Sequence, residues 1–143
     1  MYLSIDPGIS TGWAAWYFEP DTRRFRLHSC GRGEGWPYVQ FLKALIERPQ
    51  VYGASQSKGD PNDLITLAIR VGRYSERLEY LHGTHVDHVF PNAWKGQTPK
   101  EVTKRRVAKA LQEMGQLADL SCHDVVDALG LGLYASRSGL WRP

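Results

Sequence analysis

Four acidic residues stand at or within short apolar segments that are far apart in this sequence: Asp6, Glu47, Asp124 and Asp127. Asp6 ends the apolar run Met1–Ile5 and is followed by a Pro-Gly turn, and Glu47 closes Ala44–Ile46. A carboxylate beside core residues is costly because burial disfavours its charged form, and several together repel one another unless cations neutralise them. The pattern suggests a carboxylate cluster that holds divalent metal, which makes the chain a candidate nuclease.

The totals of the sequence narrow the class of protein. A chain of 143 residues with 42% hydrophobic residues fits one globular domain, residues 1–143. The net charge of +3 permits a polyanionic partner without demonstrating one. Cys30 and Cys122 have no metal-binding or disulfide spacing, which favours a reducing compartment. No apolar run approaches the roughly 18 residues of a membrane span. We therefore expect no membrane association and a cytoplasmic protein, in the host cytoplasm if a phage encodes it.

The spacing of apolar residues and turn signals predicts an α/β fold. Strands are expected at 2–5, 12–18, 25–29, 44–47 and 86–90, and helices at 37–43, 61–83, 98–114 and 123–135. The first three strands are close enough in sequence for an antiparallel meander, and the remainder predicts a five-stranded mixed sheet with helices on both faces. The strands that carry Asp6 and Glu47 would then be neighbours at the sheet centre. Asp124 and Asp127 would lie one helical turn apart on one side of a helix.

Several segments, in this order, resemble the RuvC-like Holliday junction resolvases, a branch of the ribonuclease H-like superfamily. They are Ser4–Gly8 with Thr11-Gly12, Leu45–Gln50, Lys58–Asp63, Val89–Pro91 with Trp94-Lys95, and His123–Gly130. The resemblance implies a ribonuclease H-like fold and a structure-selective endonuclease that resolves four-way DNA junctions. It assigns catalysis and the binding of two Mg²⁺ or Mn²⁺ ions to Asp6, Glu47, Asp124 and Asp127, with His123 as a possible accessory residue. It also implies a homodimer whose two sites cut opposed strands, leaving 5′-phosphate and 3′-hydroxyl ends.

Two groups of residues are candidates for DNA contacts. Lys95, Lys100, Lys104 and Arg105 could neutralise phosphates, although a solvated helix face would look the same. Tyr52 and Lys58 lie in a polar, glycine-containing segment that could reach into a junction, with an ordinary loop as the alternative. Arg70, Arg73 and Arg77 recur at helical spacing, which favours a polar helix face or contacts at a dimer edge.

Two other functions remain open from the sequence. One is a related nuclease that acts on RNA or RNA–DNA hybrids. The other is a non-catalytic junction-binding protein that keeps the fold, against which the intact set of four acids argues.

Overall fold

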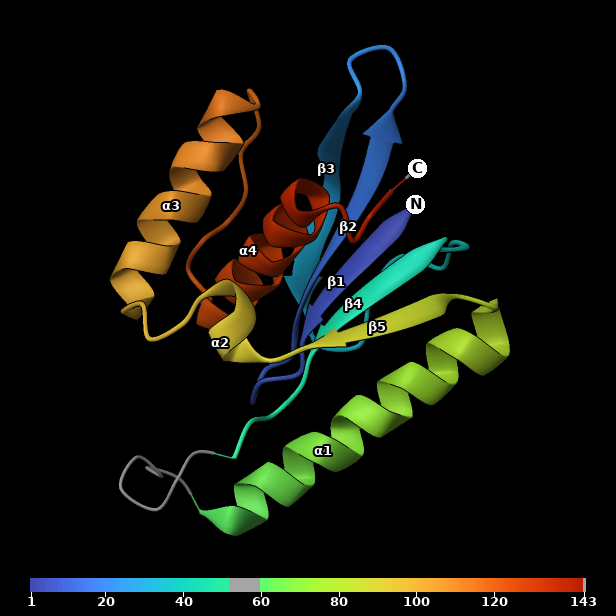
Figure 1. Ribbon diagram of the computed structural model, residues 1–143, viewed down its shortest axis with the longest axis vertical. Coiled ribbons are helices and arrows are strands. Elements are labelled where there is room, and N and C mark those ends of the chain that lie inside the picture. The colour runs from blue at the N-terminus through green and yellow to red at the C-terminus, as the bar shows by residue number, and fades with distance from the viewer. Residues whose placement is uncertain (52–59, 143) are drawn as a thin grey trace.

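Five strands form one mixed sheet in the computed structural model, which describes residues 1–51 and 60–142 (Figure 1). Their bounds are β1 Tyr2–Asp6, β2 Gly12–Glu19, β3 Arg24–Arg32, β4 Lys43–Glu47 and β5 His85–Val89. The strand order is β3-β2-β1-β4-β5. β2 is antiparallel to β1 and β3, whereas β4 is parallel to β1 and β5. The expected meander and the pairing of β1 with β4 at the centre are confirmed.

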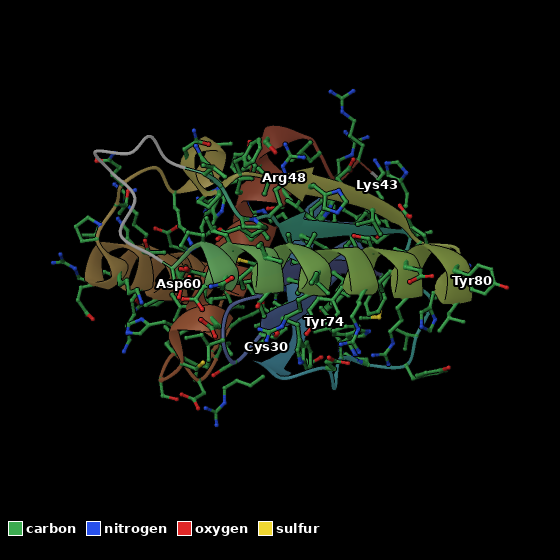
Figure 2. All side chains as sticks on the ribbon, turned by 90° about the horizontal axis from the view of Figure 1, so that it is seen from below. Cys30, Lys43, Arg48, Asp60, Tyr74 and Tyr80 are labelled. Atoms are coloured by element: carbon green, nitrogen blue, oxygen red, sulfur yellow. The ribbon has the colours of Figure 1, made fainter. Side chains whose placement is uncertain are left out.

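Helices cover both faces of this sheet, as the sequence predicts. Their bounds are α1 Pro61–Glu76 with a π-helical continuation η1 Arg77–Leu81, α2 Pro91–Trp94, α3 Lys100–Glu113 and α4 His123–Ser138. α1 lies across one face, and α4 packs on the other with α3 outside it (Figure 1). Figure 2 looks onto α1, where Tyr74 is buried and Tyr80, in η1, is 85% exposed. Among the described residues, no helix is both long and apolar enough to cross a membrane.

The expected helix at 37–43 is wrong. This segment has no helix, and β4 begins at Lys43. Apart from a local bond of the Val39 amide to the Pro37 carbonyl, its backbone bonds to distant elements: the Leu42 amide donates to the Met1 carbonyl at 2.7 Å, and the Thr84 hydroxyl donates to the Phe41 carbonyl at 3.1 Å. Burial of the Phe41 ring in the core therefore takes precedence over local helical bonding.

A short helix that the sequence reasoning did not anticipate, α2, follows β5. It begins at Pro91, whose fixed backbone angle suits the first position of a helix. The helix ends at Trp94, with Lys95 as its C-cap. This one turn determines where Trp94 and Lys95 lie relative to the ends of the central strands.

The alternation of side chains along β1 decides which face each residue joins. Leu3 and Ile5 enter the core cluster beneath α1, whereas Tyr2 enters the cluster beneath α4 and the Ser4 hydroxyl donates to the Ala128 carbonyl of α4. Because successive side chains on a strand point to opposite faces, Asp6 must continue the row of Tyr2 and Ser4. Asp6 therefore points toward the α4 side of the sheet.

Small residues let α4 approach the sheet closely. The Ser4 hydroxyl donates to the Ala128 carbonyl at 2.7 Å and accepts a hydrogen bond from the Trp16 indole at 3.1 Å. A Cβ atom added at Gly132 would lie 2.2 Å from that indole nitrogen, Nε1. The depth of α4, and with it the position of the acids on its first turns, depends on this contact.

We predict that Gly132→Ala lowers the free energy of unfolding by about 1–3 kcal/mol, because the added methyl group overpacks a buried contact. Gly72→Ala is the matched control, since no heavy atom lies within 4 Å of a Cβ added at that position of α1. The control should raise stability by about 0.5–1 kcal/mol through its backbone entropy. Urea unfolding followed by circular dichroism measures both, and equal stabilisation by the two substitutions would contradict the packing argument.

Candidate functional site

Two carboxylates meet where the central parallel strands end. In the register of β1 and β4, Ile5 is opposite Ile46, so the next pair is Asp6 and Glu47. Leu45 joins the core cluster on the α4 side, and Glu47, two residues on, points the same way. Asp6 is 8% exposed and the Glu47 side chain 12% exposed. Strand register and alternation thus place two carboxylates side by side at the edge of the core.

The start of α4 supplies the other two acids. Asp124 and Asp127 lie on its first turns, where the positive end of the helix dipole favours negative charge. The Asp127 side chain is 17% exposed and faces the sheet between flanking core residues, Val126 and Ala128. The four acids predicted from the sequence therefore gather at one end of the sheet.

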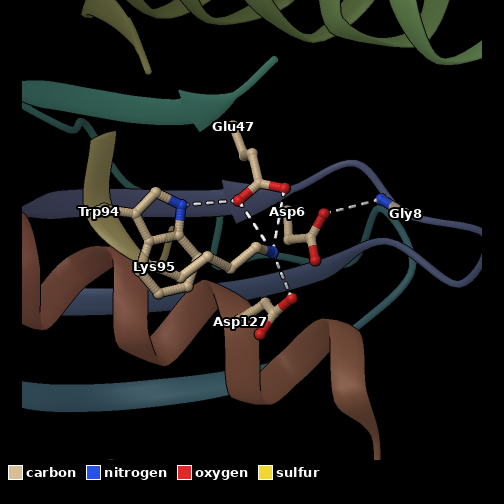
Figure 3. Close-up of polar contacts among 6 residues, drawn as sticks. All are labelled: Asp6, Gly8, Glu47, Trp94, Lys95 and Asp127. Atoms are coloured by element: carbon tan, nitrogen blue, oxygen red, sulfur yellow. Dashed lines mark hydrogen bonds and ion pairs between the residues drawn. The ribbon is translucent and has the colours of Figure 1, made fainter. Parts of the chain in front are cut away.

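Lys95 bridges two of these acids (Figure 3). Its ammonium lies 2.6 Å from Asp127 Oδ2, and 3.2 and 3.1 Å from the two carboxylate oxygens of Glu47. The Trp94 indole donates to Glu47 Oε2 at 2.6 Å and so orients that carboxylate. Both donors come from the short helix α2 and its C-cap. The site is therefore built from the ends of the central strands β1 and β4, the N-terminus of α4 and the short helix α2.

Asp124 is held differently, by the segment that joins β1 to β2. Its Oδ2 accepts a hydrogen bond from the Ser10 amide at 2.8 Å, while the Gly8 amide donates to Asp6 Oδ1 at 3.1 Å. Gly8 is required by this closeness, because a Cβ there would lie 2.7 Å from Asp124 Oδ1. The backbone of this turn contacts two of the four acids.

Burial and the closeness of these charged groups shift the pKa values of Asp6, Glu47 and Lys95. Burial, and then the charge of Glu47, raise the pKa of Asp6 well above its ordinary value; Lys95 opposes this shift, and Asp127 and Asp124 add smaller increases. Burial also raises the pKa of Glu47, although Lys95 and the Trp94 hydrogen bond oppose the shift. For Lys95, burial alone would lower the pKa, but Glu47 and Asp127 reverse this and raise it. The ammonium stays charged while the carboxylates compete for protons.

The carboxylate oxygens of the site suit a hard divalent cation, although the side chains do not form a complete set of ligands around one point. Within residues 1–51 and 60–142, no three histidine, cysteine, aspartate or glutamate side chains are arranged to hold one ion. Lys95 lies between Glu47 and Asp127, and Asp124 is bonded to Ser10. Carboxylate oxygens are nevertheless the ligands that Mg²⁺ and Mn²⁺ prefer. Four of them against the single Lys95 ammonium leave negative charge for a cation to offset.

The other residues singled out from the sequence lie around this centre. Lys95 is inside the site, whereas Lys100, Lys104 and Arg105 follow on α3, with Lys100 and Arg105 exposed. His123 is the exposed first residue of α4 and does not appear among the described hydrogen bonds of the four acids. Tyr52 and Lys58 lie outside the described residues.

Three contacts of the site were not predicted from the sequence. Trp94 binds Glu47, Ser10 binds Asp124, and Arg70 of α1 reaches the carbonyls of Pro7 and Gly8. Trp94 stands beside Lys95 in a segment that the resemblance already marks, so a signal was present there. Ser10 contributes a backbone amide, for which residue type carries no signal. Arg70 has the helical spacing of a solvent-facing side chain.

The chain is similar to known proteins in structure but not in sequence. No family model matches the sequence, and no curated protein is significantly similar to it. T. thermophilus RuvC in complex with a Holliday junction substrate matches with a TM-score of 0.63 at 16% identity, over 96% of each chain. Fowlpox virus resolvase in complex with Holliday junction DNA matches with a TM-score of 0.58 at 17% identity, over 96% of this chain and 99% of that one.

These matches define the fold in two steps. The five-stranded mixed sheet with helices on both faces is a ribonuclease H-like fold. Within that class, the chain has the fold of the RuvC-like Holliday junction resolvases along almost its whole length, which confirms the fold that the resemblance of its motifs implies.

We predict that Asp6→Asn stabilises the metal-free protein at pH 8 by on the order of 1 kcal/mol and gives little or no gain at pH 4. Because the folded pKa of Asp6 is raised, the native state binds more protons than the unfolded state between the unfolded and folded pKa values. Stability therefore falls as pH rises through that window, and the amide avoids this loss. Urea unfolding in chelator at both pH values measures it. Asp21→Asn, which removes an exposed carboxylate, is the control, and a gain for Asp6→Asn that does not depend on pH would refute the cause.

Proposed function

We propose that this protein is a metal-dependent endonuclease that resolves four-way DNA junctions. The observation that carries the proposal is the gathering of Asp6, Glu47 and Asp127 at the ends of β1 and β4, where the Lys95 ammonium pairs with Glu47 and Asp127. Strongly perturbed carboxylates in such a cluster are typical of catalytic sites. The fold supports the substrate class, since T. thermophilus RuvC and the fowlpox virus resolvase with this fold were both solved with Holliday junction DNA.

In this mechanism Asp6, Glu47, Asp124 and Asp127 would hold two Mg²⁺ or Mn²⁺ ions. When bound, such a pair supplies an activated water and relieves charge on the departing 3′ oxygen, which leaves 5′-phosphate and 3′-hydroxyl ends. The chain's own part is positioning. The Trp94 indole holds Glu47 by one oxygen, and the Ser10 amide holds Asp124 by Oδ2.

Lys95 would change partners during this cycle. Its ammonium donates hydrogen bonds to Glu47 and Asp127 and so neutralises part of their charge. Cations bound by the same carboxylates would repel it, and a backbone phosphate is the anion that junction DNA brings to the site. We therefore assign Lys95 to the phosphate nearest the cut.

Junction resolution needs two cuts in opposed strands, and the described part of this chain carries one cluster of four acids. A homodimer would supply the second cluster. The mass in solution, measured by light scattering at several concentrations, tests this part of the proposal separately from catalysis.

The basic side chains at the start of α3 would extend the DNA-binding surface. Lys100 begins this helix a few residues after Lys95, and Lys104 lies one turn further on. Figure 1 shows α3 beginning near α2 and running outside α4, which lies between it and the sheet. Phosphates that flank the cut would therefore meet these lysines.

One observation favours a second candidate, a non-catalytic junction-binding protein. The Lys95 ammonium pairs with both Glu47 and Asp127, and a fixed cationic side chain could take the place of a metal ion in a site that had lost its chemistry. Asp6 favours catalysis, because none of the described ion pairs includes it. Its pKa is raised by burial first and by the charge of Glu47 second, and a bound cation would offset both.

We predict that the protein makes paired nicks in a labelled four-way junction with Mg²⁺, and that Asp6→Asn slows cutting by on the order of 10³-fold or more while binding is kept. Linear duplex and an RNA–DNA hybrid run beside the junction test the substrate class. Asp21→Asn should cut like the wild type. Tight junction binding without cutting at any Mg²⁺ or Mn²⁺ concentration would instead identify the non-catalytic binder, and preferential cutting of the hybrid would identify a ribonuclease.

We also predict that Lys100→Gln combined with Lys104→Gln weakens junction binding and lowers the salt dependence. Each phosphate contact contributes about 0.9 to the slope of log K against log salt, so the slope should fall by about 2. Binding titrations at several salt concentrations measure it. Lys109→Gln is the control on the same helix, because Lys109 already pairs with Glu113 at 3.9 Å. An unchanged slope in the double variant would remove α3 from the DNA surface.

A further inference from the structure

The turn between β1 and β2 holds a conformation that needs support. Thr11 has φ +40°, in the left-handed region that residues with side chains rarely adopt. Its amide closes the turn on the Gly8 carbonyl at 3.0 Å. A non-glycine residue keeps such a backbone only where its surroundings hold it there.

α1 supplies part of that support. The Arg70 guanidinium donates through Nη1 to the Pro7 carbonyl at 3.1 Å and to the Gly8 carbonyl. One turn further along α1, the Tyr74 hydroxyl lies 3.0 Å from Thr11 Oγ1 in a buried contact. Residues four apart share a helix face, so both side chains reach the turn from one direction. Tyr74 itself is fixed by its ring, which packs edge-on against Trp36.

The opposite side of the same turn faces the acids. The Gly8 amide donates to Asp6 and the Ser10 amide donates to Asp124. The closest approach is at Gly12, where a Cβ would lie 1.9 Å from the Asp124 carbonyl oxygen. The turn is thus enclosed between two α1 side chains and two acids of the site, and any shift on the α1 side moves the amides that hold the acids.

We propose that Arg70 and Tyr74 are positioning residues that clamp this turn and so hold Asp6 and Asp124 in the geometry that binds divalent cations. This inference rests on the metal site of the proposed function, but the clamp itself belongs to the metal-free protein. Arg70 carries the larger share, because a charged donor binding two carbonyls is stronger than a neutral hydroxyl contact.

The test compares Arg70→Met, Arg70→Lys and Tyr74→Phe with Arg73→Met, which removes the same charge from the same helix. Within the described residues, Arg73 does not hydrogen-bond to this turn. The first measurement needs no metal: amide hydrogen exchange of Gly8, Ser10 and Thr11 by NMR. The exchange of these amides should become at least about tenfold faster in Arg70→Met and remain near the wild-type rate in Arg73→Met.

The second measurement is Mn²⁺ titration of each protein by calorimetry. Arg70→Met should raise the dissociation constant about tenfold and Tyr74→Phe about threefold, sizes expected for lost charged and neutral hydrogen bonds. Arg70→Lys should restore part of the affinity, since an ammonium can still donate to one carbonyl. With junction DNA, kcat should fall while KM stays near the wild-type value, because the clamp acts on the reacting centre.

Each outcome supports or overturns a specific statement. Equal exchange and equal Mn²⁺ affinity in Arg70→Met and Arg73→Met overturn the clamp, even if the wild type cuts junctions. Faster exchange with unchanged Mn²⁺ affinity overturns the positioning role. A wild type that binds Mn²⁺ but cuts nothing refutes the proposed function and leaves the clamp to be decided by the first two measurements. Failure of the wild type to bind Mn²⁺ refutes the proposed function and the positioning role, and the exchange measurement alone then decides whether Arg70 and Tyr74 clamp the turn. If Arg70→Met does not fold, Tyr74→Phe and Arg70→Lys carry the same comparison.

Discussion

The Lys95 ammonium, held between Glu47 and Asp127, is the contact on which the geometry at the ends of β1 and β4 depends. Asp6 and Glu47 lie at the boundary of the core, where water screens charges poorly and like charges repel strongly. One ammonium lowers this repulsion without abolishing it. The protein therefore keeps an arrangement that costs folding stability at neutral pH, as sites built to bind cations and polyanions commonly do.

The backbone has to bring its elements unusually close for these charges to meet. The contact of Gly132 with Trp16 lets α4 lie low on the sheet, and Gly8 and Gly12 let the first turn pass against Asp124. Each position excludes even a methyl group. The acids are consequently held by packed backbone and by hydrogen bonds from neighbouring amides, so their spacing is a property of the whole fold.

Much of this arrangement can be read from the chain alone, because it follows from short-range periodicity. Alternation along β1 places Asp6 in the row of Tyr2 and Ser4, and the same rule puts Glu47 in the row of Leu45. The helical spacing of Asp124 and Asp127 puts them one turn apart. The five strands and the three longer helices are likewise found where apolar spacing predicts them.

The remainder depends on contacts between distant segments, which periodicity does not encode. The expected helix at 37–43 gives way to burial of Phe41 and to bonds with distant backbone. The ammonium of Lys95 points inward to the acids, and Arg70 reaches across to the first turn. The sequence by itself determined the sheet, the three longer helices and the four acids. Only the tertiary structure decided their partners, because long polar side chains bond to whatever groups packing leaves within reach.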